Sequence, residues 1–319
     1  MNIWIQVLLL LVGLFLIVKG ADWLVDGASG VARRFGLSEF VIGLTIVGMG
    51  TSAPEMVVSF IGAFHGNADI AIGNVVGSNI MNTLLILGVT ALILPMAVTG
   101  SNKKRDIPVN IFITVLLIVL GLEHTFFGIG TDGLNRVDGA ILIAFFLLYM
   151  WMSFKGNKAE EDNSPAKQRN IWLCLLMIAA GLAGLVFGGN LFVDNATEIA
   201  HALGVSDKFI AITILAGGTS MPELATCVVA AAKKKGQLAL GNIIGSNVFN
   251  ILLILGGSAL ITPLSFAGMN YVDLGVLLLS ALVLASALVI GKKDQIDRLD
   301  GALFVAIWAG YMAYLILNL

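Results

Sequence analysis

Two glutamates and a set of hydroxyl and amide side chains occur twice in this chain, at one spacing, inside long apolar stretches. Residues 50–55 read Gly-Thr-Ser-Ala-Pro-Glu, and residues 218–223 read Gly-Thr-Ser-Met-Pro-Glu. Each is followed by a phrase that contains Gly-Ser-Asn-x-x-Asn, at 77–82 and 245–250. The offset is 168 residues throughout, and 20 of 46 positions are identical between 43–88 and 211–256. Polar, helix-breaking residues are costly at membrane depth, so their repetition indicates a functional site.

The two glutamates, Glu55 and Glu223, are the carboxylates expected in the middle of membrane spans. A charged side chain there costs about 2.5–3.5 kcal/mol on insertion scales. The repeated phrases contain no Lys or Arg that could pair with them. Protonation or a bound cation must therefore offset the cost.

Neighbouring oxygen donors favour a cation. Serine and asparagine four residues apart share a helix face, and a proline frees a backbone carbonyl about one turn earlier. Hard oxygen ligands of this kind suit Ca²⁺ or Na⁺. The candidate metal ligands are Glu55, Glu223, Thr51, Ser52, Ser78, Asn82, Thr219, Ser220, Ser246 and Asn250, with the carbonyls near Gly48 and Ala216.

Structural roles are the alternative for each of these residues. A serine or threonine in a membrane helix commonly bonds back to its own backbone. Glycines at i and i+4, such as Gly73 and Gly77, are typical of close helix packing. A buried, hydrogen-bonded acid is the corresponding alternative for the glutamates, and their pairing across a repeat argues against it.

The composition places the chain in the membrane. Of 319 residues, 58% are hydrophobic and 12% are charged, whereas soluble domains carry about 25% charged residues. The net charge of −2 gives no indication of nucleic-acid binding. We expect an all-α polytopic protein whose partner is the lipid bilayer, with no cofactor and no protein partner implied.

Hydropathy predicts ten transmembrane helices, and the basic residues orient them. With an outside N-terminus, 16 of the 18 Lys and Arg residues fall on the inside, which favours N- and C-termini outside. The run Lys233–Lys235 is read as a topology determinant, with contact to acidic lipids as the alternative. The predicted spans are 4–20, 38–64, 69–94, 107–123, 137–154, 170–187, 206–232, 237–261, 271–290 and 299–317.

The repeat divides the chain into two halves of opposite orientation. We expect a first five-helix repeat at 1–154, a short cytoplasmic linker at 155–169 and a second five-helix repeat at 170–319. An odd number of spans per half makes the repeat inverted, an architecture of secondary transporters. Glycine and proline in spans two, three, seven and eight predict broken or kinked helices.

These phrases resemble the two α-repeats of the sodium/calcium exchanger branch of the Ca²⁺/cation antiporter superfamily, especially its prokaryotic members. The resemblance covers essentially the whole chain. It implies that spans two, three, seven and eight form the transport core, that Glu55 and Glu223 are the central Ca²⁺ ligands, and that spans one and six slide across the core. Many members carry Asp where this chain has Asn250, so the resemblance implies two formal charges and no dedicated K⁺ site.

The function expected from these observations is secondary active exchange of Ca²⁺ for Na⁺ by alternating access. A Ca²⁺/H⁺ antiporter is the alternative, because protons could also neutralise both glutamates. A cation channel is less favoured, since channels usually arrange parallel symmetry around a pore. An enzyme is not expected, because the hydroxyls and amides have no role in an acid protease dyad. The expected location is the plasma (inner) membrane, as a multi-pass protein.

Overall fold

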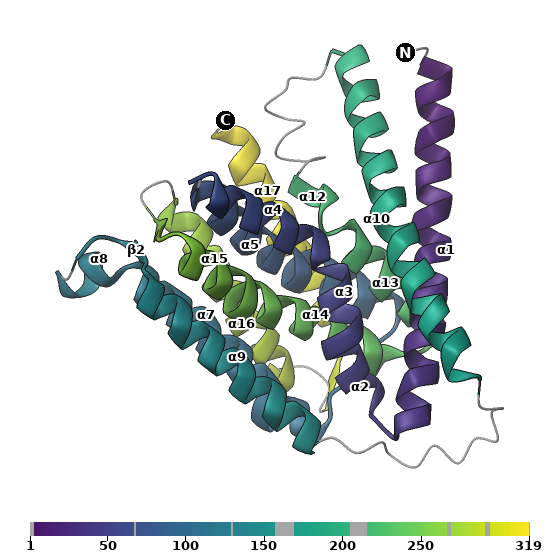
Figure 1. The fold of residues 1–319 in the computed structure, drawn as a ribbon, viewed down its shortest axis with the longest axis horizontal. Coiled ribbons are helices and arrows are strands. Elements are labelled where there is room, and N and C mark those ends of the chain that lie inside the picture. Colours follow the sequence, from purple (N-terminus) through teal and green to yellow (C-terminus); the bar gives the residue numbers. More distant parts are fainter. Residues whose placement is uncertain are drawn as a thin grey trace.

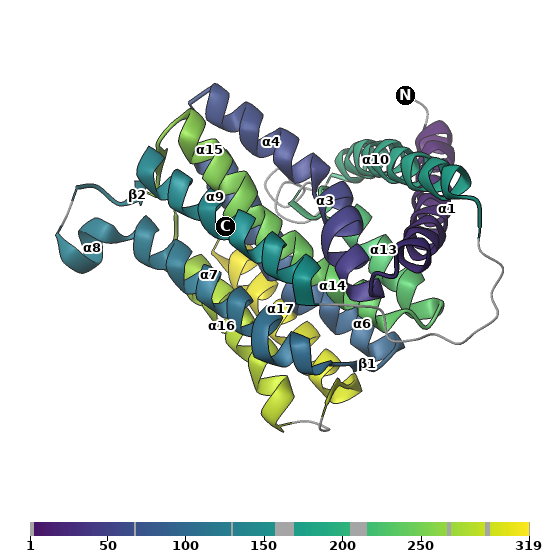
Figure 2. The same cartoon turned by 60° about the horizontal axis from the view of Figure 1, so that its bottom comes forward.

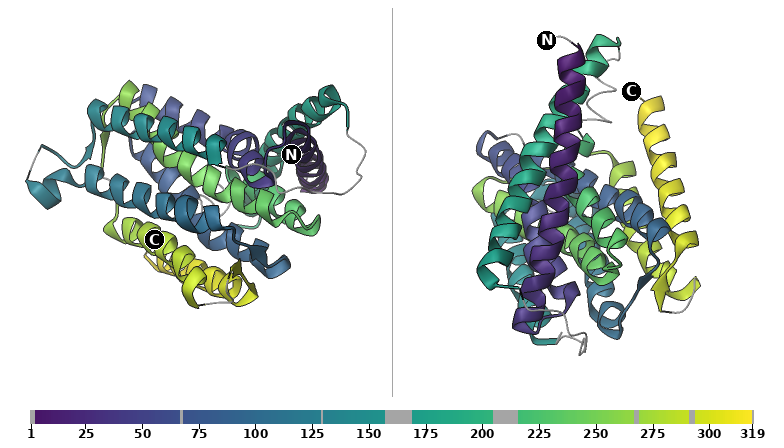
Figure 3. Two further views of the ribbon diagram at one scale, coloured as in Figure 1. Left: turned by 90° about the horizontal axis from the view of Figure 1, so that it is seen from below. Right: turned by 90° about the vertical axis from the view of Figure 1, so that its right-hand side faces the viewer.

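The protein is a bundle of helices (Figure 1), described by a computed structural model for residues 3–66, 68–128, 130–156, 169–204, 216–266, 269–290 and 294–318. Residues 206–215 of the predicted seventh span and 157–168 of the predicted linker lie outside the described residues. The Ile3 end of α1 and the Leu317 end of α17 lie on the same side of the molecule, at the top of Figure 1 and of the right-hand view in Figure 3.

The helix bounds follow the predicted segments closely, apart from the first and the sixth. Wider, π-helical turns are marked η. The helical elements are α1 (Ile3–Phe35), α2 (Glu39–Ile42), η1 (Gly43–Val47), α3 (Gly48–Thr51), α4 (Ala53–Phe64), α5 (Ala68–Ile80), η2 (Met81–Ile86), α6 (Leu87–Ile93), η3 (Asn102–Asp106), α7 (Ile107–Gly121), α8 (Glu123–Phe127), α9 (Arg136–Gly156), α10 (Ile171–Ala202), α12 (Ala216–Gly218), α13 (Met221–Ala232), α14 (Gly236–Val248), η5 (Phe249–Leu255), α15 (Gly256–Ile261), α16 (Tyr271–Ile290) and α17 (Arg298–Leu317).

Six described helices are long and apolar enough to cross a membrane, or seven when one bent pair counts as a single span. These helices make the chain a multi-pass membrane protein. The count of ten spans and the outside location of the termini stay predictions.

Helices α1 and α10 form an antiparallel pair at one side of the molecule, as Figure 3 shows. They extend well beyond the predicted spans 4–20 and 170–187. Glycines line the contact: a Cβ added to Gly20 would lie 2.7 Å from the Gly181 carbonyl oxygen, and one added to Gly13 would lie 2.8 Å from that of Gly188. Such close approach of two backbones is the usual role of small residues in membrane helix pairs.

The second predicted span is broken, as expected. Segment 39–51 and α4 meet at an angle of 49°, with the break at Ser52. Pro54 stands in the first turn of α4, where a missing N–H costs no helical hydrogen bond. Pro222 has the same place in α13. The part of the seventh span before α12 lies outside the described residues.

The third and eighth predicted spans are not broken. Residues 70–93 and 236–261 each form one continuous helix that contains a π-helical turn, η2 or η5. Neither stretch contains proline, so glycine and asparagine widen the helix locally without interrupting it. The second of these helices is the central element, with 94% of its apolar window buried inside the protein.

Two short strand pairs link the halves of the chain. Strand β1 (Met96–Ala97) pairs antiparallel with β4 (Gln295–Ile296), and β2 (Gly133–Leu134) pairs antiparallel with β3 (Leu264–Ser265). Each pair joins residues of 1–154 to residues of 170–319, and the two pairs lie at different ends of the bundle (Figure 2). The halves are therefore interlocked at both ends.

Candidate functional site

Two buried carboxylates lie where broken helices restart. Glu55 lies in the first turn of α4 and Glu223 in the first turn of α13, and both are 0% exposed. The first turn of a helix presents N–H groups without helical partners and a partial positive charge. This placement stabilises the negative charge of the two glutamates, with which no basic side chain in the described part of the chain forms an ion pair.

The hydroxyls of one half bind the carboxylate of the other. Ser52 Oγ donates to Glu223 Oε1 at 3.0 Å, and Ser220 Oγ donates to Glu55 Oε1 at 3.2 Å. The offset of 168 residues relates these two hydrogen bonds, so the repeat in the sequence is a repeat of contacts. The carboxylates therefore belong to one site with two equivalent walls.

Each carboxylate also binds a serine of its own half. Ser78 Oγ donates to Glu55 Oε1, and Ser246 Oγ donates to Glu223 Oε1, both at 3.4 Å. Ser78 further contacts Ser220 Oγ at 3.1 Å. The structure thus brings the four predicted serines together around the two glutamates.

Four oxygen atoms in this site are buried and have no hydrogen-bond partner among the described residues. They are the Oε2 atoms of Glu55 and Glu223 and the Oδ1 atoms of Asn82 and Asn250. All four are acceptors, and the four positions form two pairs at the offset of 168 residues. An unsatisfied buried acceptor costs about 1–3 kcal/mol, more when it is charged. A hard cation satisfies such oxygens directly, so the donor set fits Ca²⁺ or Na⁺.

The remaining predicted ligands differ in how closely they approach this centre. Thr51 Oγ1 donates to its own backbone at the Val47 carbonyl, at 3.0 Å, and also lies 3.1 Å from Asn242 Oδ1. Thr51 therefore makes the structural contact that was its alternative role, and it also interacts with the Glu223 carboxylate. The Gly48 carbonyl lies 3.5 Å from Ser246 Oγ, which places it at the edge of the site.

The second-half counterparts of Thr51 and Gly48 are described less fully. Thr219 interacts with the Glu55 carboxylate. Ala216 begins α12, and the surroundings of its side chain lie outside the described residues.

Sequence reasoning missed a network of asparagines that joins the two central helices. Asn250 Nδ2 donates to Asn79 Oδ1 at 2.9 Å, and Asn82 Nδ2 donates to Asn247 Oδ1 at 3.3 Å. Asn247 Nδ2 in turn donates to Thr83 Oγ1 at 2.9 Å. These bonds occupy the amide nitrogens of Asn82 and Asn250, whereas their buried oxygens have no hydrogen-bond partner among the described residues.

A signal for this network was present in the repeated phrase. Asn79 and Asn247 are the asparagines of Gly-Ser-Asn, related by the same offset as the glutamates. A polar residue at membrane depth that repeats in both halves could have been included on that ground alone. Asn74 and Asn242, at the start of the same phrases, likewise bind the site's surroundings: Asn74 Nδ2 donates to the Glu55 carbonyl at 3.2 Å.

A family model described as "Sodium/calcium exchanger protein" matches residues 5–155 and 173–317, nearly the whole chain. The chain belongs to the sodium/calcium exchanger family. This family comprises transporters, and the membership agrees with a symmetric, oxygen-lined site inside a multi-pass membrane protein.

Curated relatives of this exchanger match it over almost their full length. The sodium/calcium exchanger MaX1 of Methanosarcina acetivorans is 34% identical over 352 residues, covering 98% of this chain and 99% of the relative. The putative antiporter CaxA of Alkalimonas amylolytica is 39% identical over 326 residues, covering 96% and 97%. Among solved structures, the sodium-calcium exchanger NCX_Mj soaked with 10 mM Na⁺ and 10 mM Sr²⁺ has a TM-score of 0.84 at 35% identity, covering 98% of each chain.

Replacing Asn250 of this exchanger with Asp should destabilise the cation-free protein. The Asn250 amide donates to Asn79 Oδ1 and to Ser78 Oγ, at 2.9 and 3.2 Å, and an ionised Asp can donate to neither. It also adds a third negative charge beside Glu55 and Glu223. We expect the thermal unfolding midpoint measured without divalent cations to fall by about 2–6 °C. Added Ca²⁺ should then raise the midpoint of the variant by more than it raises that of the unaltered protein.

The matched control is Asn318→Asp, the same change at an exposed position beyond α17. Its midpoint should stay within about 1 °C of the unaltered value, since surface substitutions rarely matter. Equal midpoints for Asn250→Asp and Asn318→Asp would contradict the structural role given to the Asn250 amide.

Proposed function

We propose that this chain is a secondary active antiporter that exchanges Ca²⁺ for Na⁺. The observation that carries the proposal is the cluster of four buried, unsatisfied oxygens at Glu55, Glu223, Asn82 and Asn250. Two carboxylates can neutralise one Ca²⁺ or two Na⁺ in the same place, so the ions compete. Family membership and relatives named as sodium/calcium exchangers support this choice of ions.

Neutralisation of the site explains why exchange occurs without a leak. With no cation bound, two negative charges lie in a buried site, and a change of access must carry them through a low-dielectric region. With Ca²⁺ or two Na⁺ bound, the same movement carries no net charge in the site. The switch is therefore rapid in the loaded states and slow in the empty one.

Alternating access in this proposal is a sliding of α1 and α10 across the broken helices. The pair is joined along its glycine-lined contact and lies at one side of the bundle, which allows it to move as a unit (Figure 3). The inverted repeat supplies two equivalent end states. The site residues would stay in place while access changes from one face to the other.

The location and the partners proposed are those that follow from the exchange. The chain would act in the plasma (inner) membrane, with Ca²⁺ and Na⁺ as substrates, and would need no cofactor. Its ligands would be drawn from the two glutamates, Asn82, Asn250 and the four serines, with Thr51, Thr219 and the carbonyls near Gly48 and Ala216 completing the ion sites.

The counter-ion requirement of Ca²⁺ flux tests the proposal. In proteoliposomes loaded with Na⁺, dilution into Na⁺-free buffer should drive ⁴⁵Ca²⁺ uptake at least about tenfold above that of liposomes loaded with K⁺ or choline. Protein-free liposomes are the control. Uptake driven by a pH gradient in the absence of Na⁺ would favour Ca²⁺/H⁺ exchange instead, and flux without any counter-ion would indicate a channel.

A further inference from the structure

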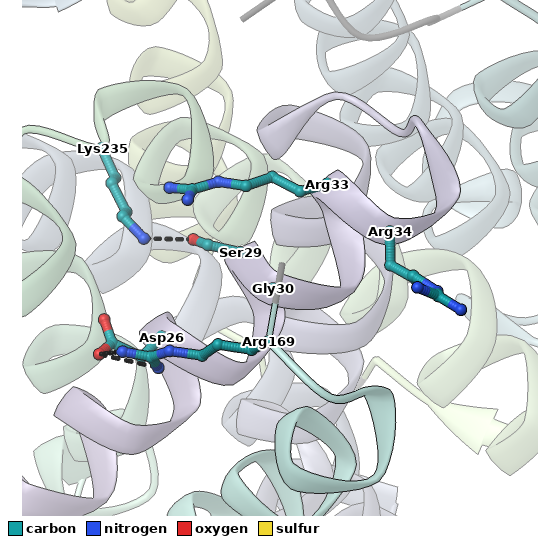
Figure 4. Close-up of a pocket in the computed structure, with 7 residues that line it drawn as sticks. All are labelled: Asp26, Ser29, Gly30, Arg33, Arg34, Arg169 and Lys235. Atoms are coloured by element: carbon teal, nitrogen blue, oxygen red, sulfur yellow. Dashed lines mark hydrogen bonds and ion pairs between the residues drawn. The ribbon is translucent and has the colours of Figure 1, made fainter. Parts of the chain in front are cut away.

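A pocket with a strongly basic lining lies at the end of α1 that the distribution of Lys and Arg predicts to be cytoplasmic. It is separate from the ion site, and its walls come from three places: the last turns of α1, the segment just before α10 and the turn between α13 and α14 (Figure 4). The lining residues are Asp26, Ser29, Gly30, Arg33, Arg34, Arg169 and Lys235.

The acidic groups near this pocket already have basic partners. Lys233 Nζ lies 2.6 Å from Asp22 Oδ1 and 2.6 Å from Asp26 Oδ1. Arg169 Nη1 lies 3.3 Å from Asp26 Oδ2. Two acids of α1 are therefore matched by Lys233 and Arg169, and these pairs tie the helix to the core and to the start of α10.

Arg33 and Lys235 converge on the pocket without such a match. Figure 4 shows the Arg33 side chain extending toward Lys235, whose ammonium donates to Ser29 Oγ. Within the described part of the chain, no carboxylate forms an ion pair with either residue. Glu39 and Asp26 act on Lys235 only through their longer-range fields. Two like charges thus face a half-enclosed space.

The environment of Lys235 reflects this imbalance. Burial lowers the pKa of its ammonium below the ordinary value. The charges of Glu39 and Asp26 act in the opposite direction, and those of Arg33 and Lys233 lower this pKa further. An anion between Lys235 and Arg33 would remove this cost.

The donors in the pocket suit a phosphate group. A guanidinium offers paired N–H donors, an ammonium offers a point charge and the neighbouring Ser29 offers a hydroxyl, a combination that binds phosphate oxygens well. On α1, Trp23 precedes the residues that line the pocket and Phe35 follows them, and these side chains are 45% and 65% exposed. Tryptophan is enriched at the membrane interface, where lipid head groups lie.

We propose that this pocket binds a phosphate group, and that the head group of an anionic phospholipid of the inner leaflet supplies it. The phosphate contacts Arg33 of α1 and Lys235 of the α13–α14 turn at once. It therefore links the helix that is proposed to slide to the core against which it slides, and it stabilises the arrangement of α1 seen here.

Thermal unfolding of the full chain in detergent tests this site without any reference to transport. Three additions are compared: dioctanoyl phosphatidylglycerol, dioctanoyl phosphatidylcholine and inorganic phosphate. We expect phosphatidylglycerol to raise the unfolding midpoint by roughly 3–8 °C at a hundredfold excess over its Kd, with no comparable effect of phosphatidylcholine. A similar rise with inorganic phosphate would identify free phosphate, not lipid, as the source of the same group.

The variant Arg33→Gln/Lys235→Met removes the two converging cations. Since electrostatic contact with anionic lipid changes affinity roughly fivefold per basic residue, we expect roughly 30-fold weaker phosphatidylglycerol binding. The control is Lys104→Gln/Lys155→Gln, which removes two exposed cations from the predicted cytoplasmic face outside the pocket. It should bind phosphatidylglycerol as the unaltered protein does. If the double variant folds poorly, Lys235→Met alone should still weaken binding about fivefold.

Two results would overturn the proposal. One is that phosphatidylglycerol does not raise the unfolding midpoint, or raises it equally in the unaltered protein and in Arg33→Gln/Lys235→Met. The other concerns the acidic residues Glu160, Glu161 and Asp162, which precede Arg169 in the sequence. If phosphatidylglycerol raises the unfolding midpoint only after these three are changed to Gln, Gln and Asn, the occupant of the pocket is the chain's own linker and not a lipid.

Discussion

Replacing Glu223 with Gln, or Glu55 with Gln, should reduce Na⁺-driven Ca²⁺ uptake by at least about 100-fold. Glutamine keeps the size of the side chain and an oxygen that can accept from the serine hydroxyls, which are Ser52 and Ser246 in the case of Glu223. It removes one of the two negative charges of the site. A single ion contact at about 4 Å contributes about 4 kcal/mol at an effective dielectric constant of 20, which is close to a thousandfold in affinity. Initial rates of ⁴⁵Ca²⁺ uptake into proteoliposomes measure the effect.

Stability separates this loss from misfolding. The carboxylates are buried and lack a basic partner within hydrogen-bond distance among the described residues, so removal of one charge should leave the cation-free unfolding midpoint unchanged or raise it. Glu123→Gln, in the first turn of α8 and outside the site, is the matched control and should transport normally. The double variant should be at least as impaired as either single one, because both charges act on the same ion. Uptake that survives in both single variants would refute the assigned ion site.

Replacing Gly241 with Ala should destabilise the folded protein severely. A Cβ added there would lie 2.2 Å from the Phe40 carbonyl oxygen, and at Gly245 it would lie 2.3 Å from the Leu44 carbonyl oxygen. Both contacts are with backbone atoms, which cannot rotate out of the way. Overpacking of this kind costs about 1–3 kcal/mol or more, so we expect the unfolding midpoint to fall by about 5–10 °C or the yield of folded protein to collapse.

Gly310→Ala is the control for this change. Gly310 is exposed on α17, and no described atom lies within 4 Å of its added Cβ. Alanine favours helix over glycine by up to about 1 kcal/mol, so this variant should be as stable as the unaltered protein or slightly more so. Scanning fluorimetry of the two purified variants measures both midpoints. Equal midpoints would show that α14 does not pack against residues 40–44 as closely as described.

The contacts at Gly241 and Gly245 also explain how the ion site is held. They place α14 against residues 40–44, in the helical segment that precedes the break at Ser52. Ser246, one residue after Gly245, then reaches Glu223 Oε1 and the Gly48 carbonyl. Gly241 and Gly245 therefore serve packing, as their spacing predicts, and this packing positions a serine of the site. The prediction is wrong for Gly73 and Gly77, since no described atom lies within 4 Å of a Cβ added to either.

Much of the site could be predicted from the chain because its residues violate the rule for membrane segments. Glu55 and Glu223 are costly in an apolar stretch, so their presence and repetition identify them without a structure. The helix bounds of most spans were also predictable, since apolar length and turn residues set them. Hydropathy did not predict the second halves of α1 and α10, because Asp26, Asp194 and several glycines interrupt the apolar pattern there. In the antiparallel pair, each of these second halves packs against the first half of the other helix, and both helices also contact α13.

The amino-acid sequence by itself determined the chemical composition of the site, its twofold repetition and the family to which the chain belongs. Tertiary structure alone decided which half supplies which partner: Ser52 binds Glu223, not the Glu55 three residues after it, and Ser220 binds Glu55. It also decided that the nitrogens of Asn82 and Asn250 bind Asn247 and Asn79, while their buried oxygens have no partner among the described residues. The physical reason is that residue type and helical period set the local geometry of one element. The direction of a hydrogen bond between elements depends on how two helices far apart in the chain are packed.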